Sequence, residues 1–420
     1  MRILWFTNTP LTKGKGSAYN GEGWVRSMLG ALKSSQDGGG PEIGVAFNEG
    51  HKFRKKEIDG ATCYCLPTTV PGRLGRFKQM HVSAKQLEKD TEKEWKAQEE
   101  SCLQAIEDFK PDAIHIWGSE SAYGLVAGRT DIPCVLHIQG LLLPCETAYF
   151  PPHMSRKEYI RQDRNPLKII TRQWELHNWK RNREREAEIM HRVGHVVGRT
   201  FWDRQLAALM APQAAYHECG EILRPAFYDD CQRRLPRRLT LVSTVSRAMY
   251  KGYDMILRTA AVLRQMCGLD FEWRVYGNVE PRYAEAVTGI KPETVGVRLR
   301  GVVGSKELQE ALATCSIYVH PSYIDNSPNS LCEAQILGCP VVATNVGGIP
   351  SLIEEGVTGY TVPANDPYQM AYRIKELAAD PERLAAMGVK ARETALERHS
   401  RERVTGQLID IYREITGIHD

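Results

Sequence analysis

Short apolar, β-branched segments alternate with longer amphipathic segments along almost the whole chain, and this alternation constrains the fold most strongly. In the first half the apolar segments read RILWFTN, IGVAF, ATCYCLP, AIHIWG, CVLHIQG and HVVGRT. Helical periodicity lies between them, for example over 84–109 and 201–210. Because these segments are continuously apolar, they predict strands covered by helices on both faces, as in a parallel α/β sheet.

The alternation is interrupted once and then restarts. Residues 224–238, RPAFYDDCQRRLPRR, contain two prolines and many charges, which predicts a linker. The strand candidates TLVSTVS, EWRVYGN, VRLRGVV, IYVHPS, PVVATN and YTVP follow it, with a helix expected over 253–266. We therefore predict two doubly wound, Rossmann-like domains, 1–223 and 239–395, with a ligand in the cleft between them. Residues 396–420 are expected to form a helix that returns to the first domain.

Composition bounds the class of protein. A chain of 420 residues is long enough for two domains, and a net charge of +4 gives no general nucleic-acid signature. The start, MRILWFTNTP, has too short an apolar run for a signal peptide, and no run is long enough to span a membrane. Eleven scattered cysteines indicate reduced thiols. We expect a cytoplasmic protein.

The segment 320–348, HPSYIDNSPNSLCEAQILGCPVVATNVGG, combines a strand end, a polar loop and a helix start. A helix is predicted from about Asn329 to Gly338, with Asn329 or Ser330 as its N-cap. The amide groups of Ser330 and Leu331 would then be free in the cleft. Free amides at a helix start bind anions such as phosphate.

Two acidic residues flank this helix start. Glu333, about one turn into the helix, can accept hydrogen bonds from two neighbouring hydroxyls, such as those of a ribose. Asp325, on the preceding loop, can reach a hydroxyl of whatever the phosphate carries. In the alternative interpretation Glu333 only complements the helix dipole and Asp325 is a turn residue. The spacing of the two acids alone does not decide between these interpretations.

The surrounding sequence resembles a known signature. PSYIDNSPNSLCEAQILGCPVVATNVGGIPSLIEEGVTGYTVP, residues 321–363, resembles the donor site of family-4 (group 1) retaining glycosyltransferases, which have the GT-B fold. Weaker similarity covers nearly the whole chain. The signature has two acids with seven residues between them, but the first is usually Glu rather than Asp325, and Gly-Phe-Gly usually replaces NSPN.

The resemblance implies a glycosyltransferase of polysaccharide biosynthesis. A sugar would pass from a nucleotide diphosphate sugar to a hydroxyl of a glycan or lipid-linked glycan, with retention of configuration. Without metal ligands in view, basic side chains must neutralise the leaving nucleotide, so no metal or other cofactor is expected. The family has an Arg and a Lys five residues apart; here Arg247 and Lys251 in SRAMYKGYD are four apart. Lys251 therefore matches better than Arg247, although a lysine after a strand is often only a surface residue.

Further candidate residues follow from the resemblance. His137, which ends the strand CVLHIQG, would face the sugar or would be a satisfied structural histidine. Two residues after another strand end would line the acceptor side or form a structural ion pair: Arg199 and Asp203. Gly21 and Gly23 are expected near the donor phosphate and the acceptor. Gly277 is expected near the base. Gly347 and Gly348 are expected near the sugar.

Residues 153–192 carry eleven Arg or Lys residues against six acids, together with Trp174 and Trp179. One interpretation is contact with an anionic membrane surface, at the inner face of the membrane, or with a lipid-diphosphate-linked acceptor. The other is a solvated helix with intrahelical ion pairs.

Two other functions remain open for the whole chain. The first is a non-hydrolysing nucleotide-sugar epimerase, which shares the fold. The second is a non-catalytic GT-B subunit that only binds the donor.

Overall fold

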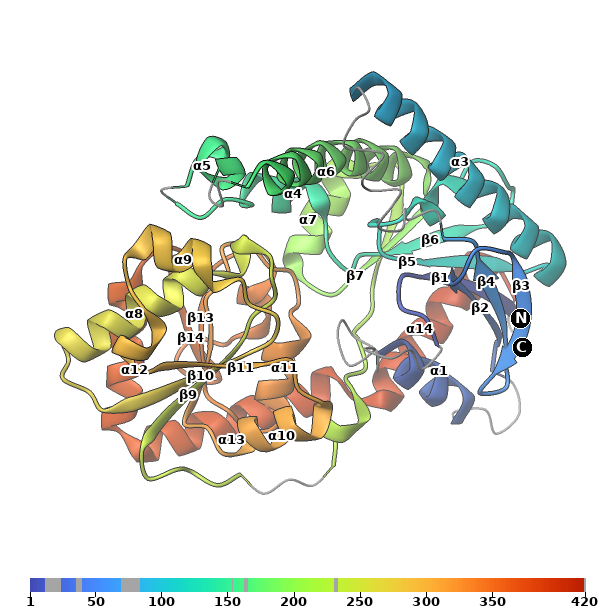
Figure 1. Ribbon diagram of the computed structural model, residues 1–420. Coiled ribbons are helices and arrows are strands. Elements are labelled where there is room, and N and C mark those ends of the chain that lie inside the picture. The colour runs from blue at the N-terminus through green and yellow to red at the C-terminus, as the bar shows by residue number, and fades with distance from the viewer. Residues whose placement is uncertain are drawn as a thin grey trace.

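The computed structural model consists of two α/β domains side by side (Figure 1). It describes residues 1–11, 24–34, 40–68, 84–152, 154–161, 165–229 and 233–418. The two chain ends lie close together on the N-terminal domain (Figure 1), where Thr416 Oγ1 lies 3.5 Å from Met1 Sδ.

The N-terminal domain contains an eight-stranded sheet in the order β3-β4-β2-β1-β5-β6-β7-β8. All neighbouring strands pair in parallel except the edge pair β3 and β4. The strands are β1 (Arg2–Thr7), β2 (Glu42–Asn48), β3 (Arg54–Ile58), β4 (Ala61–Leu66), β5 (Ala113–Trp117), β6 (Cys134–His137), β7 (His195–Gly198) and β8 (Ala215–Glu218).

The C-terminal domain contains a six-stranded, fully parallel sheet in the order β11-β10-β9-β12-β13-β14. Its strands are β9 (Leu239–Thr244), β10 (Phe271–Tyr276), β11 (Val297–Gly301), β12 (Ile317–His320), β13 (Val341–Thr344) and β14 (Gly359–Val362). The chain moves outward in one direction from β9 to β11 and in the other from β12 to β14. The crevice between β9 and β12 is therefore the point where such sheets bind ligands.

Helices cover both faces of each sheet, because consecutive strand residues point to opposite faces. In the N-terminal domain they are α1 (Trp24–Ser34), α3 (Ala84–Phe109), η1 (Ala122–Val126), α4 (Leu142–Thr147), α5 (Arg156–Arg161), α6 (Pro166–Arg192) and α7 (Phe201–Met210). The rest are η2 (Pro225–Phe227), η3 (Met249–Lys251), α8 (Tyr253–Gln265), α9 (Pro281–Thr288), η4 (Pro292–Val295), α10 (Ser305–Ala313), α11 (Asn329–Ile336), η5 (Ile349–Leu352), α12 (Pro367–Ala379), α13 (Pro381–Arg398) and α14 (Arg401–Thr416).

The last helix, α14, packs against the N-terminal sheet beside α1 (Figure 1). Its Tyr412 is fully buried there, and the hydroxyl accepts a hydrogen bond from Trp5 Nε1 at 2.8 Å. His115 Nδ1 lies 2.6 Å from the same hydroxyl. The helical stretch after Pro381 thus divides at His399 and Ser400, where the chain crosses from the C-terminal to the N-terminal domain.

The segment between the domains packs mainly on the C-terminal domain. Phe227 is buried in the core on one face of the second sheet. Arg233 donates to the backbone carbonyls of Cys315 and Ser316, both at 2.9 Å. This part of the predicted linker is therefore a structured edge of the second domain.

Two further observations concern the described residues alone. Their cysteines form no disulfide. None of their helices is both long and apolar enough to cross a membrane.

Candidate functional site

A cavity of about 240 Å³ opens at the carboxyl ends of β9, β10 and β12, where the strand order of the second sheet reverses. We call it the first cavity. Two of its lining residues come from outside the C-terminal domain: Trp24 at the start of α1 and Arg224 after the N-terminal domain. The others are Thr244, Val245, Ser246, Lys251, Tyr276, Gly277, Val302, Val303, Leu308, His320, Asn329, Ser330 and Glu333.

Lys251 and Asp325 form an ion pair at this cavity. Lys251 Nζ donates to Asp325 Oδ2 at 2.6 Å, and His320 Nε2 and Ser322 Oγ lie 2.9 and 3.1 Å from the same oxygen. Burial alone would raise the pKa of Asp325, but the Lys251 ammonium and the His320 hydrogen bond hold this pKa well below its ordinary value. Asp325 is therefore an ionised carboxylate at neutral pH.

Two glycines allow the backbone approaches that place this pair. Gly252 has φ +74°, and a Cβ there would lie 2.1 Å from the carbonyl oxygen of Pro321. Gly347 has φ +53°, and its Cβ would lie 1.9 Å from the carbonyl oxygen of Asp325. Gly348 N–H donates to that same carbonyl at 3.0 Å. Gly347 and Gly348 thus support the Asp325 loop through its backbone.

The start of α11 offers two amide groups to the first cavity. Asn329 and Ser330 line it, and their backbone N–H groups have no acceptor among the described residues. Leu331 differs from our expectation, because its N–H donates to the carbonyl of Pro328 at 2.9 Å. The N-cap is Pro328, without a side-chain cap, rather than Asn329 or Ser330. The anion site expected at this helix start therefore has the free amides of Asn329 and Ser330, rather than those of Ser330 and Leu331.

Glu333 already has a strong partner that sequence reasoning missed. Arg224 donates from Nε and Nη2 to the two carboxylate oxygens at 2.6 and 2.7 Å, and Glu333 is only 2% exposed. Burial raises the pKa of Glu333, although the Arg224 hydrogen bonds oppose this. The Arg224 guanidinium also lies 4.8 Å from the ring centre of Phe227. An arginine in a predicted linker gives no sequence signal for such a contact.

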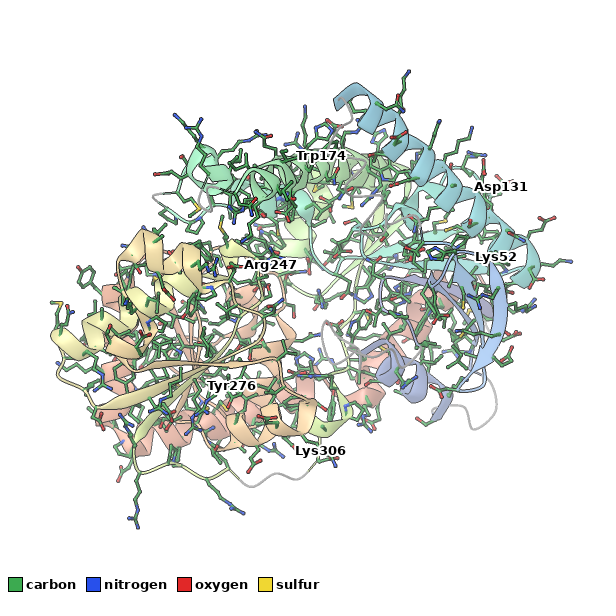
Figure 2. All side chains as sticks on the ribbon, viewed as in Figure 1. Lys52, Asp131, Trp174, Arg247, Tyr276 and Lys306 are labelled. Carbon is green, nitrogen blue, oxygen red and sulfur yellow. The ribbon has the colours of Figure 1, made fainter. Side chains whose placement is uncertain are left out.

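The structure separates the two predicted cations. Lys251 lines the first cavity, whereas Arg247 is exposed and lines a second cavity beside α6 (Figure 2). Ala248 between them is extended, with ψ 130°, and the tight turn η3 begins only at Met249. Arg247 therefore lies outside the turn that carries Lys251, which differs from the expectation of one shared diphosphate site.

His137 lies inside the N-terminal core and lines neither cavity. It is fully buried and stacks on Trp117 with ring centres 4.6 Å apart, with His115 at 5.4 Å. Neither ring nitrogen has a partner among the described residues, and burial lowers the pKa of His137 well below its usual value. Trp117 in turn contacts Trp24, which borders the first cavity. His137 therefore lies in the core on the face of the sheet that carries α1, and the expectation that it faces the sugar stays a prediction.

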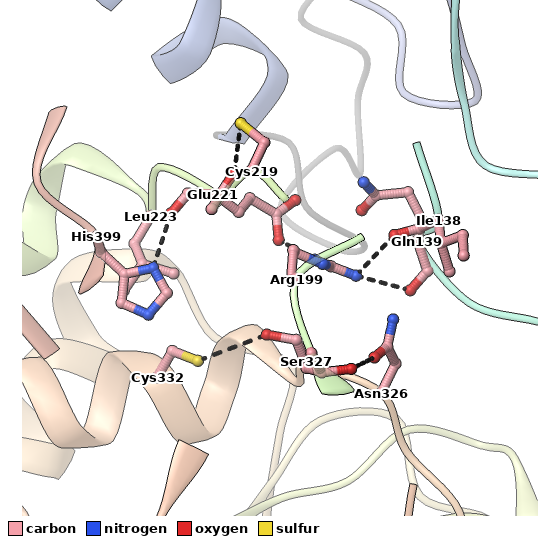
Figure 3. Close-up of polar contacts among 12 residues, drawn as sticks. Ile138, Gln139, Arg199, Cys219, Glu221, Leu223, Asn326, Ser327, Cys332 and His399 are labelled. Carbon is pink, nitrogen blue, oxygen red and sulfur yellow. Dashed lines mark hydrogen bonds and ion pairs between the residues drawn. The ribbon is translucent and has the colours of Figure 1, made fainter. Parts of the chain in front are cut away.

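Arg199 and Asp203 both make polar contacts within the protein, and Figure 3 shows those of Arg199. Arg199 forms a buried ion pair with Glu221 and donates to two backbone carbonyls after β6 at 3.0 and 3.1 Å. Asp203 caps α7, since its Oδ2 accepts from the N–H groups of Arg199 and Thr200 at 2.8 and 3.1 Å. Of the two interpretations, the geometry favours a structural role, with Glu221 as the ion-pair partner.

The start of α7 also joins the two domains. Thr200 Oγ1 donates to Asn326 Oδ1 at 3.0 Å, and Phe201 N–H donates to Ser351 Oγ at 3.1 Å. Asn326 follows Asp325 directly, so the N-terminal domain holds the loop that carries the first acid of the signature (Figure 3).

The basic segment before β7 uses many of its charges inside the molecule. Arg181 pairs with Glu92 and Glu184 at 3.0 and 2.8 Å, and the guanidinium of Arg185 lies 5.2 Å from the ring centre of Trp95. These contacts match the ion-pair interpretation for the second half of α6.

The predicted glycines and the search for a metal site complete the description of this region. Gly277 lines the first cavity, as proposed for a residue near the base. Gly21 and Gly23 lie outside the described residues. Within the ranges described above, no three His, Cys, Asp or Glu side chains form a group that could hold a metal ion.

The comparison with protein families identifies the second domain. Residues 236–380 match the family Glycosyl transferases group 1. The C-terminal domain belongs to this family. The matched range contains Lys251, Asp325, Glu333 and the start of α11, so this group 1 domain carries most of the first cavity.

The chain matches curated relatives over only part of their length. The chain is 30% identical over 147 residues to alpha-maltose-1-phosphate synthase of Mycolicibacterium smegmatis, which covers 32% of this chain and 38% of that protein. It is 24% identical over 222 residues to the amylovoran biosynthesis glycosyltransferase AmsK of Erwinia amylovora, which covers 50% of this chain and 54% of that protein. The matches thus cover between 38% and 54% of the length of these two relatives.

Solved structures show the GT-B fold across the whole chain. Sucrose-phosphate synthase from Thermosynechococcus elongatus superimposes with a TM-score of 0.70 at 16% identity, over 99% of each chain. HepE from Anabaena, solved in complex with UDP, superimposes with a TM-score of 0.61 at 14% identity, over 99% of this chain and 100% of HepE. The fold predicted from the alternation of strands and helices is confirmed.

Proposed function

We propose that this chain is a retaining glycosyltransferase. It transfers a sugar from a nucleotide diphosphate sugar to a hydroxyl of a glycan or lipid-linked glycan in polysaccharide biosynthesis. The charge of the leaving nucleotide is absorbed by fixed basic side chains and helix-start amides, without a metal ion. The group 1 domain and the named activities of the relatives support the reaction class.

The observation that carries the proposal is the first cavity itself. It places one ammonium group, Lys251, and the free amides of Asn329 and Ser330 around a space at the switch point of the sheet. These groups suit a diphosphate, and Glu333 in the same wall suits the ribose hydroxyls. HepE, which shares the fold, binds UDP according to its structure, so UDP is the first nucleotide to test.

The proposed chemistry follows from this arrangement. The bond between the sugar C1 and the donor phosphate oxygen breaks, and a bond from C1 to the acceptor oxygen forms on the same face. A phosphate oxygen of the departing nucleotide takes the acceptor proton. Lys251 and the two amides stabilise the negative charge that develops on that phosphate, which lowers the barrier where charge appears. Ionised Asp325 holds a sugar hydroxyl in place.

Titration calorimetry with UDP, GDP and ADP, and with their sugar conjugates, tests the proposal. One nucleotide should bind, and Lys251→Ala should weaken it by about ten-fold or more, because a charged hydrogen bond is lost. The matched control is Lys390→Ala on α13, an exposed lysine that pairs with Glu393 at 2.7 Å. Transfer should persist in a chelator; activity lost with chelator and restored by manganese would contradict the metal-free part.

The same assay separates the alternative functions. Interconversion of the donor sugar without any acceptor would indicate an epimerase. If the chain binds the donor but neither transfers its sugar nor slowly hydrolyses it, the chain is a non-catalytic subunit. Either result would replace the proposal.

A further inference from the structure

A second cavity of about 380 Å³ lies between α6 and the C-terminal domain. In Figure 1 the segment from α4 to α6 extends over the C-terminal domain above α9, and Figure 2 shows Arg247 beneath α6. Both domains line the cavity, and the lining residues that bear on its ligand are Tyr149, Tyr159, Glu175, Asn178, Trp179 and Arg247. Neither the signature of the first cavity nor the proposed reaction uses it.

Aromatic rings form one part of its wall. Tyr149 lies edge-on to Trp179, with ring centres 5.1 Å apart, and edge-on to Tyr159 at 5.9 Å. The hydroxyls of Tyr149 and Tyr159 lie 3.3 Å apart, so this wall also carries polar groups. The indole Nε1 of Trp179 is buried and has no partner among the described residues. Such a wall offers flat apolar faces for the C–H surface of a ligand and donors at their edges.

Planar polar side chains form the rest of the wall. Asn178 is exposed and lines the cavity, and its side chain makes no hydrogen bond within the described part of the chain, whereas Asn182 Oδ1 accepts from Arg185 at 3.1 Å. Glu175 Oε2 accepts from the Tyr159 hydroxyl at 2.7 Å, and its Oε1 has no hydrogen bond to any described residue. No acidic side chain of the described residues pairs with Arg247. Amide, carboxylate and guanidinium groups around aromatic faces suit a ring that carries many hydroxyls.

The second cavity adjoins the first through a short turn. Arg247 lines the second cavity and Lys251 lines the first. Tyr250 lies between them: its ring centre is 6.3 Å from that of Tyr149, and Lys251 Nζ is 5.5 Å from it. A ligand chain longer than one sugar unit could therefore reach from the reacting centre beside Lys251 into the second cavity.

We propose that the second cavity binds a pyranose unit of the acceptor glycan, next to the unit that is glycosylated. Tyr149 and Trp179 contact the face of the ring, and Asn178 and Arg247 hydrogen-bond its hydroxyls. This assignment rests on the proposed function, because it needs a glycan acceptor. It gives Arg247 a role in acceptor recognition in place of the diphosphate role that its position in the sequence suggests.

Saccharide binding to the full chain at saturating UDP tests this assignment. The probes are maltotriose, cellotriose and trigalacturonate, followed by saturation-transfer NMR, and UDP affinity is measured by calorimetry in parallel. At least one probe should bind. Asn178→Ala should weaken that probe by about five-fold and Arg247→Ala by about ten-fold, as expected for the loss of neutral and charged hydrogen bonds.

The control is Lys180→Ala, an exposed residue two positions further along α6 that does not line the cavity. It should change neither saccharide nor UDP binding, and the two cavity variants should leave UDP affinity within about two-fold. The assignment is overturned if no probe binds, if both cavity variants bind the probe like the unchanged chain, or if Arg247→Ala weakens UDP as Lys251→Ala does. If the unchanged chain binds no nucleotide, the proposed function itself fails, which is a separate outcome.

Discussion

Replacing Asp325 by Asn separates two demands on the Lys251 ammonium. Lys251 Nζ lies 2.6 Å from Asp325 Oδ2. A donor phosphate oxygen bound to the same ammonium would lie about 2.8 Å from Nζ, and hence at most about 5.4 Å from Oδ2. The carboxylate and the phosphate are then like charges that compete for one cation. Asp325→Asn keeps the shape of the side chain but removes its charge.

The size of this competition follows from Coulomb's law. Two unit charges about 5.4 Å apart repel by about 3 kcal/mol at an effective dielectric constant of about 20. The Lys251 side chain is 22% exposed, so solvent screens the pair and about half of that value is the better expectation. A difference of about 1.5 kcal/mol corresponds to about ten-fold in Kd. We therefore expect Asp325→Asn to bind UDP more tightly while transfer falls.

Calorimetry with UDP at low and high salt measures this effect. The gain in affinity should shrink at high salt, because screening weakens the repulsion that the substitution removes. Asp270→Asn is the matched control: its carboxylate pairs with Arg238 at 2.7 Å, is 70% exposed, and lies at the opposite end of the sheet, before β10. Weaker UDP binding by Asp325→Asn would refute the reasoning, since it would mean that Asp325 orients Lys251 for the phosphate.

Three further predictions concern buried groups. Arg224→Ala should lower the free energy of unfolding by about 3 kcal/mol, because it leaves the Glu333 carboxylate buried without its partner. Urea titrations should show a smaller loss at pH 5 than at pH 8, because burial raises the pKa of Glu333 and protonation removes its unpaired charge. His137→Phe should reduce the fall in Tm between pH 7 and pH 5. Burial lowers the pKa of His137 in the folded protein, so the unchanged protein loses stability as the pH falls below about 6.5, and the variant lacks this loss. Tyr412→Phe should cost about 1–3 kcal/mol in urea unfolding, because the buried Trp5 Nε1 loses its acceptor, whereas the exposed Tyr372→Phe should cost little.

Strand and helix order could be predicted from the sequence because it depends on local patterns. The helices predicted over 84–109 and 201–210 are α3 and α7, and the twelve strand candidates became strands. The two strands that were missed, β3 and β8, are the two outer edges of the N-terminal sheet. β3 reads RKKEI, and its charges protect an edge from pairing with other chains, so its sequence resembles a loop.

The site was predictable where its residues follow the strand ends of the C-terminal sheet. Lys251, Asn329, Ser330 and Glu333 follow strand ends of one domain, and they do line the first cavity. Arg224 reaches that cavity from a distant segment through a contact that no local pattern encodes.

Residues at the ends of strands proved harder to assign. His137 is the last residue of β6, and successive side chains of a strand point to opposite faces of the sheet. The sequence alone does not show which of these faces meets the cleft. Arg199 looked available because its partner Glu221 lies 22 residues away, on the far side of β8.

The proposed donor site is complete only when both domains contribute, and two neutral hydrogen bonds join the domains beside the loop that carries Asp325. Trp24 and Arg224 close the first cavity from outside the C-terminal domain, and the Asn326 side chain next to Asp325 is held by Thr200. Opening the cleft at this point breaks that hydrogen bond and the one from Phe201 to Ser351. Each contributes about 1 kcal/mol net, because water replaces it. A donor bound as proposed, in contact with Lys251 and Asp325, would strengthen this closure because it would hold the same loop.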